Sequence, residues 1–542
     1  MIRFRNKYIY LREIIKRIMM YNERMLPAGI QDFEKLRTSG CLYVDKTRYV
    51  YQLVRTNWPY FLGRPRRFGK SLLLSTLKAY FEGKKELFEG LAIAELEKDW
   101  TAYPVIYIDF NIGGCDSLPA LEEVAVSILE DHEHKWGITD SSEHPSVRFK
   151  RLIQAAYEKS GKKVVVLIDE YDKPLVHTMD NPDLNDAVCS FFKGFYGVLK
   201  SMDYALRFVF LTGVTKFSKV SIFSDLNQLT DISLDKQYAG VCGISETELT
   251  RYFAPEIQSL ADELEKTYDE TLVKLKKHYN GYHFSGKTEE VYNPFSLLRT
   301  FVHGIIRNYW FETGTPTLLV RMLRKVDFDI KSLDNDVPIA FDAIMDYRVE
   351  NTDPVPLLYQ TGYLTIKSYN ELLNVYTLGF PNEEVKYGFW NELLYVFMPK
   401  TNVMTEFYVG HFIRDLWAGN IESFMTRLKA FFAGIPCELD NKTEKHYQTV
   451  FYLLFKLMGQ FIDAEPSSAI GRADAVVKTV DAVYVFEFKL TGNGTAETAL
   501  KQIDDKGYLI PYTAGDRKLV KIGAEFSTEE RGLKRWIIIQ EE

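Results

Sequence analysis

The stretch that most constrains the fold runs from Phe61 to Ser71 and reads Phe-Leu-Gly-Arg-Pro-Arg-Arg-Phe-Gly-Lys-Ser. Residues 60–63 are typical of a short buried strand, and the apolar periodicity of residues 71–80 predicts a helix. A strand, a tight turn and a helix that opens with Gly-Lys-Ser form an arrangement that binds phosphate groups. We therefore expect a phosphate-binding loop here, although Arg64 stands where the usual G-x-x-x-x-G-K-[ST] pattern has its first glycine.

The chemistry of phosphate binding explains why three positions of this loop carry glycine, lysine and serine. Gly69 lets main-chain amides approach the phosphates, and Lys70 can reach the β and γ oxygens of a triphosphate. The Ser71 hydroxyl can complete a magnesium shell. The alternative, a Gly-Lys-Ser helix start that binds nothing, stays open on this stretch alone.

Further near-continuous apolar runs predict strands at residues 105–110, 164–169 and 208–213, alternating with helical patterns. Strands of this kind are covered on both faces, which favours a parallel α/β sheet. The run at 164–169 ends in Asp169 and is followed by Glu170. Ligands bind at the carboxyl ends of such strands, so we expect Asp169 to hold magnesium and Glu170 to orient a water molecule. Acids that merely solvate a strand end are the alternative.

The last of these runs ends in hydroxyl groups. Thr212 or Thr215 could sense the γ-phosphate from a neighbouring strand, and ordinary strand-end threonines explain the pattern equally well.

Composition limits the class of protein and its partners. A chain of 542 residues is too long for one hydrophobic core, and its 46% hydrophobic and 26% charged residues are typical of a folded protein. A formal net charge of −7 excludes nucleic-acid binding through the charge of the whole molecule, so such binding requires a local basic surface.

The five cysteines contain no C-x-x-C pair, which favours reduced thiols and a cytoplasmic location. No uncharged apolar run approaches the roughly 18 residues of a membrane span, so we expect no membrane partner.

The pattern along the chain predicts four parts. Residues 1–25 are basic and read as an extension ahead of the globular pattern, and residues 26–234 alternate between strand-like and helical segments. Residues 235–400 are mostly helical, with a capping box from Ser245 to Glu248. Residues 401–542 begin with helices and continue into strands.

The last part contains a hairpin that brings two acids together. The alternation in residues 471–490 predicts two strands with a two-residue turn at Val480-Asp481, which places Asp474 directly opposite Glu487. Lys489 points to the same side of the sheet. Like charges opposed in this way destabilise a sheet by roughly 0.2–1 kcal/mol, whereas a bridging divalent cation removes the repulsion. A turn shifted by one residue would put the acids on opposite faces.

Five segments resemble the predicted AAA-ATPase-like family of bacterial P-loop proteins. They are Gly29-Ile-Gln-Asp-Phe-Glu-Lys-Leu, Leu42-Tyr-Val-Asp-Lys-Thr, Arg64-Pro-Arg-Arg-Phe-Gly-Lys-Ser-Leu, Leu167-Ile-Asp-Glu-Tyr-Asp-Lys-Pro-Leu and Leu211-Thr-Gly-Val-Thr-Lys-Phe-Ser-Lys. In that family an arginine is common where Arg64 stands. The resemblance implies ATP and Mg²⁺ as ligands, and a helical lid and winged-helix-like connector in residues 235–400. The nucleotide contacts that we expect are Arg64, Arg67, Gly69, Lys70, Ser71, Leu72, Asp169 and Thr212, with Ser71 and Asp169 at the metal and Glu170 catalytic.

The hairpin resembles the PD-(D/E)XK nuclease superfamily, with Asp474 for the first acid and Glu487-Phe-Lys489 for the second half of the motif. Gln502 resembles the glutamine that often follows, and Glu444 could add a further carboxylate. The resemblance implies an α/β restriction-endonuclease-like domain over residues 401–542, in which Asp474 and Glu487 hold a metal and Lys489 and Gln502 assist catalysis. A retained but inactive scaffold is the alternative.

These features together indicate an ATPase that gates a magnesium-dependent nuclease. DNA is the expected substrate because the superfamily mostly cuts DNA. The runner-up is an ATP-switched regulatory or interaction protein with a non-catalytic nuclease-like domain, and a kinase is a weaker third reading. No arginine can be named as a finger, so monomer, dimer and hexamer all stay open.

Overall fold

The computed structural model describes residues 25–111, 116–139, 144–216, 229–286, 288–313, 323, 328–334, 336–345, 353–397, 402–434, 444–459, 463–466, 473–527, 529–530 and 532–541. The expected extension, residues 1–25, lies outside this part except for Met25.

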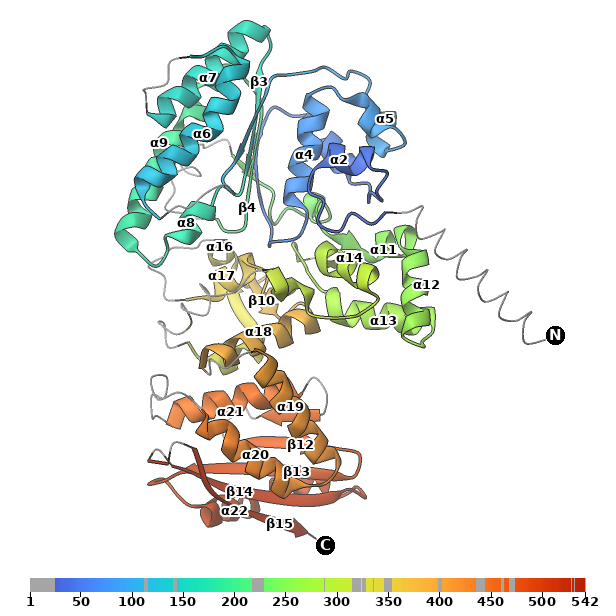
Figure 1. Ribbon diagram of the computed structural model, residues 1–542, viewed down its shortest axis with the longest axis vertical. Coiled ribbons are helices and arrows are strands. Elements are labelled where there is room, and N and C mark those ends of the chain that lie inside the picture. The colour runs from blue at the N-terminus through green and yellow to red at the C-terminus, as the bar shows by residue number, and fades with distance from the viewer. Residues whose placement is uncertain are drawn as a thin grey trace, which may run out of the picture. The chain divides into compact units, whose positions relative to one another are not determined.

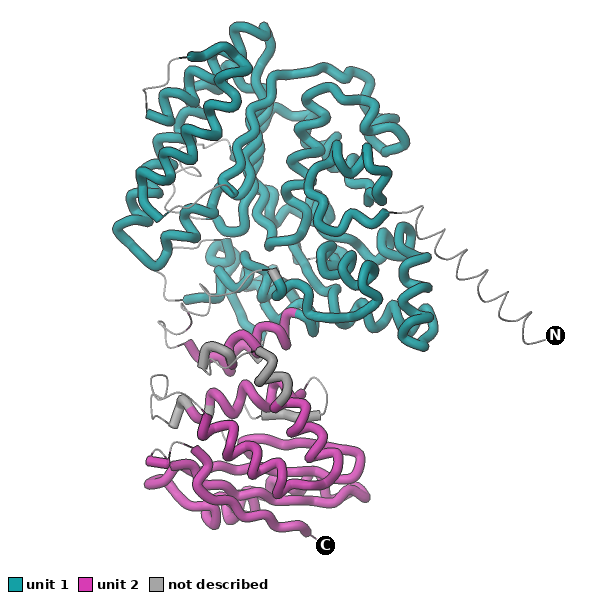
Figure 2. The backbone as a smooth tube through the Cα atoms, viewed as in Figure 1, with its two compact units in different colours: residues 1–314, 336–384 teal, residues 315–335, 385–542 magenta. Residues whose placement is uncertain are grey.

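The chain forms two compact units (Figure 2). Unit 1 comprises residues 1–314 and 336–384, and unit 2 comprises residues 315–335 and 385–542. Residues 26–234 and most of residues 235–400 therefore share unit 1, and the boundary expected at residue 401 falls inside unit 2. The division of the chain into four parts stays a prediction.

Unit 1 contains a five-stranded parallel sheet in the order β2-β3-β4-β1-β5. The strands are β1 (Pro59–Gly63), β2 (Val105–Asp109), β3 (Val164–Asp169), β4 (Leu206–Gly213) and β5 (Thr230–Asp231). All six residues of β3 are buried, as expected for a strand covered on both faces. This confirms the predicted parallel α/β sheet.

Helices cover both faces of this sheet (Figure 1). Helices α6, α7 and α9 lie on one face, and α2, α4 and α5 lie on the other. Their bounds, with those of α3 and α8, are α2 (Phe33–Thr38), α3 (Thr47–Val54), α4 (Lys70–Phe81), α5 (Ala92–Leu96), α6 (Leu118–Lys135), α7 (Pro145–Ser160), α8 (Lys173–His177) and α9 (Pro182–Ser201). The loop between β1 and α4 thus opens at the carboxyl edge of the sheet, beside the ends of β3 and β4.

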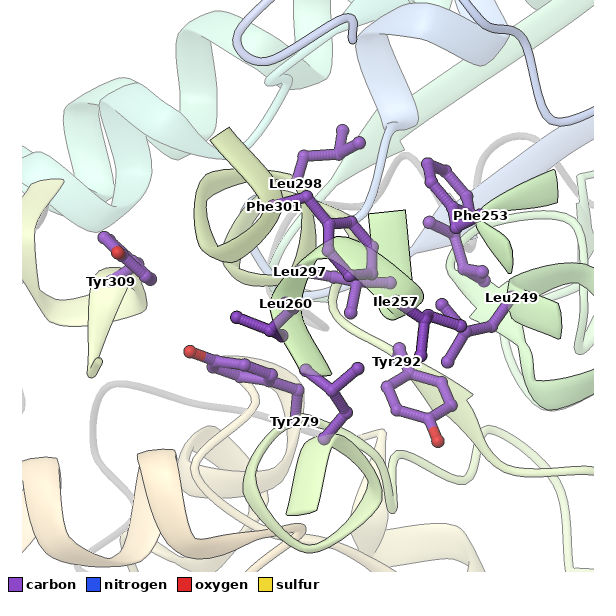
Figure 3. Packing of buried hydrophobic residues seen from close by; sticks show 12 residues of the cluster. Leu249, Phe253, Ile257, Leu260, Tyr279, Tyr292, Leu297, Leu298, Phe301 and Tyr309 are labelled. Atoms are coloured by element: carbon purple, nitrogen blue, oxygen red, sulfur yellow. The ribbon is translucent and has the colours of Figure 1, made fainter. Parts of the chain in front are cut away.

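In the rest of unit 1, more of the described residues lie in helices than in strands. Its helices are α11 (Glu246–Tyr252), α12 (Ala254–Glu263), α13 (Tyr268–Tyr279), α14 (Pro294–His303), α16 (Phe341–Ile344) and α17 (Val355–Gln360). Aromatic and aliphatic side chains of α11 to α14 form one buried cluster (Figure 3). The capping box from Ser245 to Glu248 is present and begins α11. Short strands complete this part: β6 (Ile244–Ser245), β7 (Val291–Tyr292), β8 (Val337–Ala340), β9 (Thr365–Asn370) and β10 (Val375–Gly379).

Unit 2 contains a second five-stranded sheet in the order β11-β12-β13-β14-β15, in which only β13 and β14 run parallel. Its strands are β11 (Asp463–Pro466), β12 (Ala475–Lys478), β13 (Ala482–Leu490), β14 (Lys518–Ser527) and β15 (Gly532–Glu541), and its helices are α18 (Glu383–Phe397), α19 (Asn402–Trp417), α20 (Ile421–Ala433), α21 (Glu444–Met458) and α22 (Ala496–Asp505).

Strand β13 shows how the two faces of the second sheet differ. Phe486 packs against Phe424 of α20 and Phe455 of α21. Val485 belongs to a separate cluster with Leu500 of α22. Because alternate residues of a strand face opposite sides, Glu487 and Lys489 lie on the side covered by α22.

None of the helices in the described part of the chain is both long and apolar enough to traverse a bilayer.

Candidate functional site

The loop between β1 and α4 has the backbone shape of a phosphate cradle. Gly69 has φ 95° and stands immediately before α4, whose first two residues are Lys70 and Ser71. A Cβ at Gly69 would meet no atom within 4 Å, so the left-handed backbone, rather than lack of space, explains the glycine. Arg67 also has a positive φ, 72°, which is uncommon for a residue with a side chain.

The Lys70 side chain lies inside this loop. It is 4% exposed, and its Nζ donates to the carbonyl oxygens of Arg64 at 3.1 Å and Pro65 at 3.3 Å. Nζ is also 3.9 Å from Oε1 of Glu170. An ammonium group whose partners among the described residues are two carbonyl oxygens and one distant carboxylate can exchange them for phosphate oxygens.

The acids predicted at the end of β3 lie together with Thr212. The Thr212 hydroxyl donates to Oδ1 of Asp169 at 2.6 Å, and the Glu170 amide donates to the same oxygen at 3.0 Å. Strand β4, which carries Thr212, separates β1 from β3. The structure therefore brings Lys70, Asp169, Glu170 and Thr212 to one edge of the sheet, as the sequence predicted.

Asp109 is a further acid at this edge that the sequence reading missed. It is paired with Asp169 in the register of β2 and β3. Burial and the neighbouring carboxylates of Asp169 and Glu170 raise its pKa. The signal was present, because Asp109 lies near the end of a predicted strand just as Asp169 does.

Three other residues that we expected to contact the nucleotide, Arg64, Arg67 and Leu72, lie in different surroundings. The Arg64 guanidinium is buried, donates to the carbonyls of Ser233 and Tyr238, and lies 4.1 Å from the centre of the Phe284 ring. Its guanidinium is therefore used within unit 1, and its main-chain amide is also engaged, because it donates to the Gly213 carbonyl at 3.1 Å. Arg67 stacks on the ring of Phe295, with Cζ 4.5 Å from the ring centre.

Leu72, the third of these contacts, lines a cavity of about 100 Å³ beside the loop. Gly69 also borders this cavity, and most of the remaining lining is apolar, including Phe68, Val241, Ile244 and Phe253. Leu72 therefore faces an apolar hollow beside the phosphate loop.

In unit 2 the predicted hairpin register is confirmed. Ala475 pairs with Phe486, and the Thr479 amide donates to the Ala482 carbonyl across the turn at Val480-Asp481. Asp474 precedes the first residue of β12, and its Oδ2 accepts from the Phe488 amide at 2.8 Å.

The two oxygens of Glu487 have different surroundings. The residue is 3% exposed, and Oε1 accepts from Lys489 Nζ at 2.8 Å and from Gln502 Nε2. Oε2 is buried and has no hydrogen bond of good geometry to the described residues, although the Asp474 amide lies close enough to favour the ionised form. Burial and the negative charge of Asp474 raise the pKa of Glu487 to about 7.

These surroundings fit a divalent cation. Mg²⁺ takes oxygen ligands and usually keeps several water molecules, so one oxygen each from Asp474 and Glu487 would suffice as protein ligands. Within the described ranges, no group of three or more His, Cys, Asp or Glu side chains comes together in a metal-binding arrangement. Glu444 begins α21, but its side chain lies outside the described residues.

Gln502 connects the site to helix α22. Its Oε1 accepts from Lys489 Nζ at 2.7 Å, and its Nε2 lies 3.3 Å from the hydroxyl of Tyr508. Tyr508 was not predicted, and no pattern in the sequence distinguishes it from other tyrosines. Asp474, Glu487, Lys489 and Gln502 thus meet at one place on the face that α22 covers.

Comparisons with known proteins match the two regions of the chain that contain these residues. Residues 27–223 match the family described as predicted AAA-ATPase, and residues 442–536 match the PD-(D/E)XK nuclease superfamily. A protein of Azotobacter chroococcum mcd 1, described as "Uncharacterized protein in vnfD 5'region", is 37% identical over 528 residues, which are 95% of this chain and 99% of that relative.

Proposed function

Because the chain belongs to the predicted AAA-ATPase family and carries a PD-(D/E)XK nuclease superfamily domain, we propose that it is an ATPase coupled to a magnesium-dependent nuclease that acts on DNA. Each of its two units contributes one site. ATP binds in unit 1, and the phosphodiester is cut in unit 2.

In unit 1 the proposal assigns phosphate binding to the loop and water activation to the end of β3. The amides around Gly69 and the Lys70 ammonium bind the phosphates, and Lys70 exchanges the carbonyl oxygens of its own loop for phosphate oxygens. Ser71 and Asp169 would hold Mg²⁺, which neutralises charge on the β and γ oxygens. Glu170 orients the attacking water. Thr212 holds Asp169 through its hydroxyl and lies one strand from the loop.

In unit 2 the proposal assigns the metal to Asp474 and Glu487. Mg²⁺ bound there would lower the pKa of a water molecule and polarise the phosphate. Lys489 is held by Glu487 and Gln502, which fixes its ammonium beside the Glu487 carboxylate, where it could assist in activating such a water. Gln502 keeps its amide oxygen toward Lys489, since its Nε2 is engaged by Glu487.

One observation carries the nuclease proposal furthest, the buried Oε2 of Glu487 beside Asp474. An unpaired, buried carboxylate oxygen next to a second carboxylate destabilises a protein, and a bound cation removes this cost. A sheet that served only as a scaffold would gain nothing from keeping the pair.

The second candidate is an ATP-switched interaction protein whose nuclease-like domain does not cut. The ion pair between Lys489 and Glu487 favours it, because this contact partly neutralises the acid without any metal. In that case the domain would bind DNA or a partner and leave it intact.

The test is DNA cleavage by purified protein with Mg²⁺, with and without ATP, on linear and circular DNA. We expect wild-type cleavage, loss of cleavage in Glu487→Ala, and retained cleavage in the control Asp505→Asn, an exposed acid on α22. Lys70→Ala should lose ATP binding, whereas Lys85→Ala, an exposed lysine after α4, should keep it. Cleavage by Glu487→Ala at the wild-type rate would contradict the nuclease proposal.

A further inference from the structure

The two residues after Glu170 bind the end of the neighbouring strand β4. The Tyr171 amide donates to the Thr212 carbonyl at 3.1 Å, and the Tyr171 hydroxyl donates to the Thr215 carbonyl at 2.7 Å. Oδ2 of Asp172 accepts from the amides of Val214 at 3.0 Å and Thr215 at 2.5 Å. Four hydrogen bonds therefore join this turn to the last residues of β4 and those that follow it.

Stability alone does not explain the acid in this position. Asp172 is 1% exposed, and its Oδ1 has no hydrogen-bond partner among the described residues. Burial and the negative charge of Glu170 raise its pKa to about 7. A Cβ at Gly213 would lie 2.4 Å from Oδ1, so the strand itself leaves room for the carboxylate. A buried carboxylate oxygen without a partner costs free energy, which indicates that the group serves the site.

The turn held in this way has a strained backbone. Glu170 has φ 50°, a left-handed conformation that is strained for a residue with a side chain. In this conformation its Oε1 lies 3.9 Å from Lys70 Nζ, at the mouth of the phosphate loop. Strain of this kind persists only where surrounding contacts fix it, and the bonds from Tyr171 and Asp172 are such contacts.

We propose that Asp172 is a positioning residue for ATP hydrolysis. By binding the amides of Val214 and Thr215, it holds the end of β4 against the turn that carries Glu170. Thr212 on β4 and Glu170 after β3 consequently keep a fixed separation around the position of the γ-phosphate. The inference rests on the proposed ATPase function and adds a residue that does not touch the nucleotide.

Asp172→Ala removes both hydrogen bonds to the amides, and Asp172→Asn retains an oxygen that can accept them. A misplacement of about 1 Å near reacting atoms costs on the order of 10²-fold in rate. We therefore expect kcat for ATP hydrolysis to fall by about 10- to 100-fold in Asp172→Ala, and by no more than about threefold in Asp172→Asn. The dissociation constant of a non-hydrolysable ATP analogue should stay within about threefold in both variants, because the phosphate loop is unchanged.

Tyr171→Phe removes one of the four hydrogen bonds between the turn and β4 without leaving a cavity. This variant tests the inference if Asp172→Ala does not fold. It should lower kcat by several-fold, whereas the control Tyr196→Phe should not. The Tyr196 hydroxyl is buried near Asp172 but makes no hydrogen bond to the described residues.

The outcomes separate the inference from the proposed function. Wild-type protein that hydrolyses no ATP would remove the proposed function and this inference with it. Wild-type hydrolysis with an unchanged kcat in Asp172→Ala and in Tyr171→Phe would overturn the inference alone. A loss of kcat matched by an equal loss of nucleotide affinity would also overturn it, since Asp172 would then only maintain the fold.

Discussion

At Glu487, one buried group connects stability with the proposed nuclease chemistry. Its pKa is raised from an ordinary 4.5 to about 7. Between these two pH values the folded protein therefore keeps a proton on Glu487 that the unfolded chain has already released. The contribution of Glu487 to the free energy of unfolding of the metal-free protein should consequently fall as the pH rises from about 4.5 to 7. Glu487→Gln removes this charge and keeps an oxygen for Lys489 and Gln502. At pH 8 we expect it to raise the free energy of unfolding by about 1–3 kcal/mol and to abolish cleavage.

Denaturant unfolding without metal at pH 5 and pH 8 checks this prediction. The stabilisation should be largest at pH 8 and small at pH 5, where Glu487 is already protonated. Asp505→Asn is the control and should show no such difference. Equal effects of Glu487→Gln at the two pH values would contradict the proposed state of the acid.

The same proton should compete with the metal. Metal ligands must be deprotonated, so the proposed binding of Mg²⁺ at Asp474 and Glu487 would release a proton below the pKa of Glu487, about 7. The apparent Mg²⁺ affinity should therefore rise by up to about tenfold per pH unit below pH 7 and level off above it. Titration calorimetry in buffers of different ionisation enthalpy measures this release, and Glu487→Gln should show neither the release nor tight binding. A pH-independent affinity in the wild type would exclude Glu487 as a ligand.

Four of the five strands of the first sheet were predicted, whereas the surroundings of single side chains were not. The expected strands 60–63, 105–110, 164–169 and 208–213 lie within two residues of the observed ends, because continuous apolar runs indicate strands covered on both faces. The hairpin register followed from the alternation and the turn. The two-residue strand β5 was missed since it has no apolar run. The direction of the Arg64 guanidinium and the contact of Tyr508 depend on residues distant in sequence, which no local pattern encodes.

The packing of α22 on β14 leads to a prediction at the scale of elements. A Cβ at Gly523 would lie 2.4 Å from the Ala496 carbonyl oxygen and 2.8 Å from the Leu500 side chain, so α22 lies directly against this glycine. Gly523→Ala should therefore push α22 outward, displace Gln502 from Glu487 and lower the free energy of unfolding by about 1–3 kcal/mol. Cleavage should fall although no site residue is changed.

The control is Gly410→Ala in α19, where a Cβ meets nothing within 4 Å. This change should raise the free energy of unfolding by about 0.5–1 kcal/mol. Thermal unfolding and a cleavage assay compare the two variants, and similar effects of both would show that α22 does not hold the site.

At the scale of the whole molecule, the two sites belong to different compact units and should be separable by mutation. Lys70→Ala changes only unit 1, so DNA cleavage measured without ATP should stay within about twofold of the wild type, while any effect of ATP on cleavage is lost. Glu487→Gln changes only unit 2 and should leave ATP hydrolysis within about twofold, although it abolishes cleavage. The net charge of −7 adds a condition, because DNA must be bound by a local basic surface and cleavage should weaken steeply with added salt. Parallel assays of ATPase and nuclease activity on both variants and their double mutant measure the coupling. If Lys70→Ala alone abolished cleavage in the absence of ATP, the proposal of an independent nuclease site under nucleotide control would be wrong.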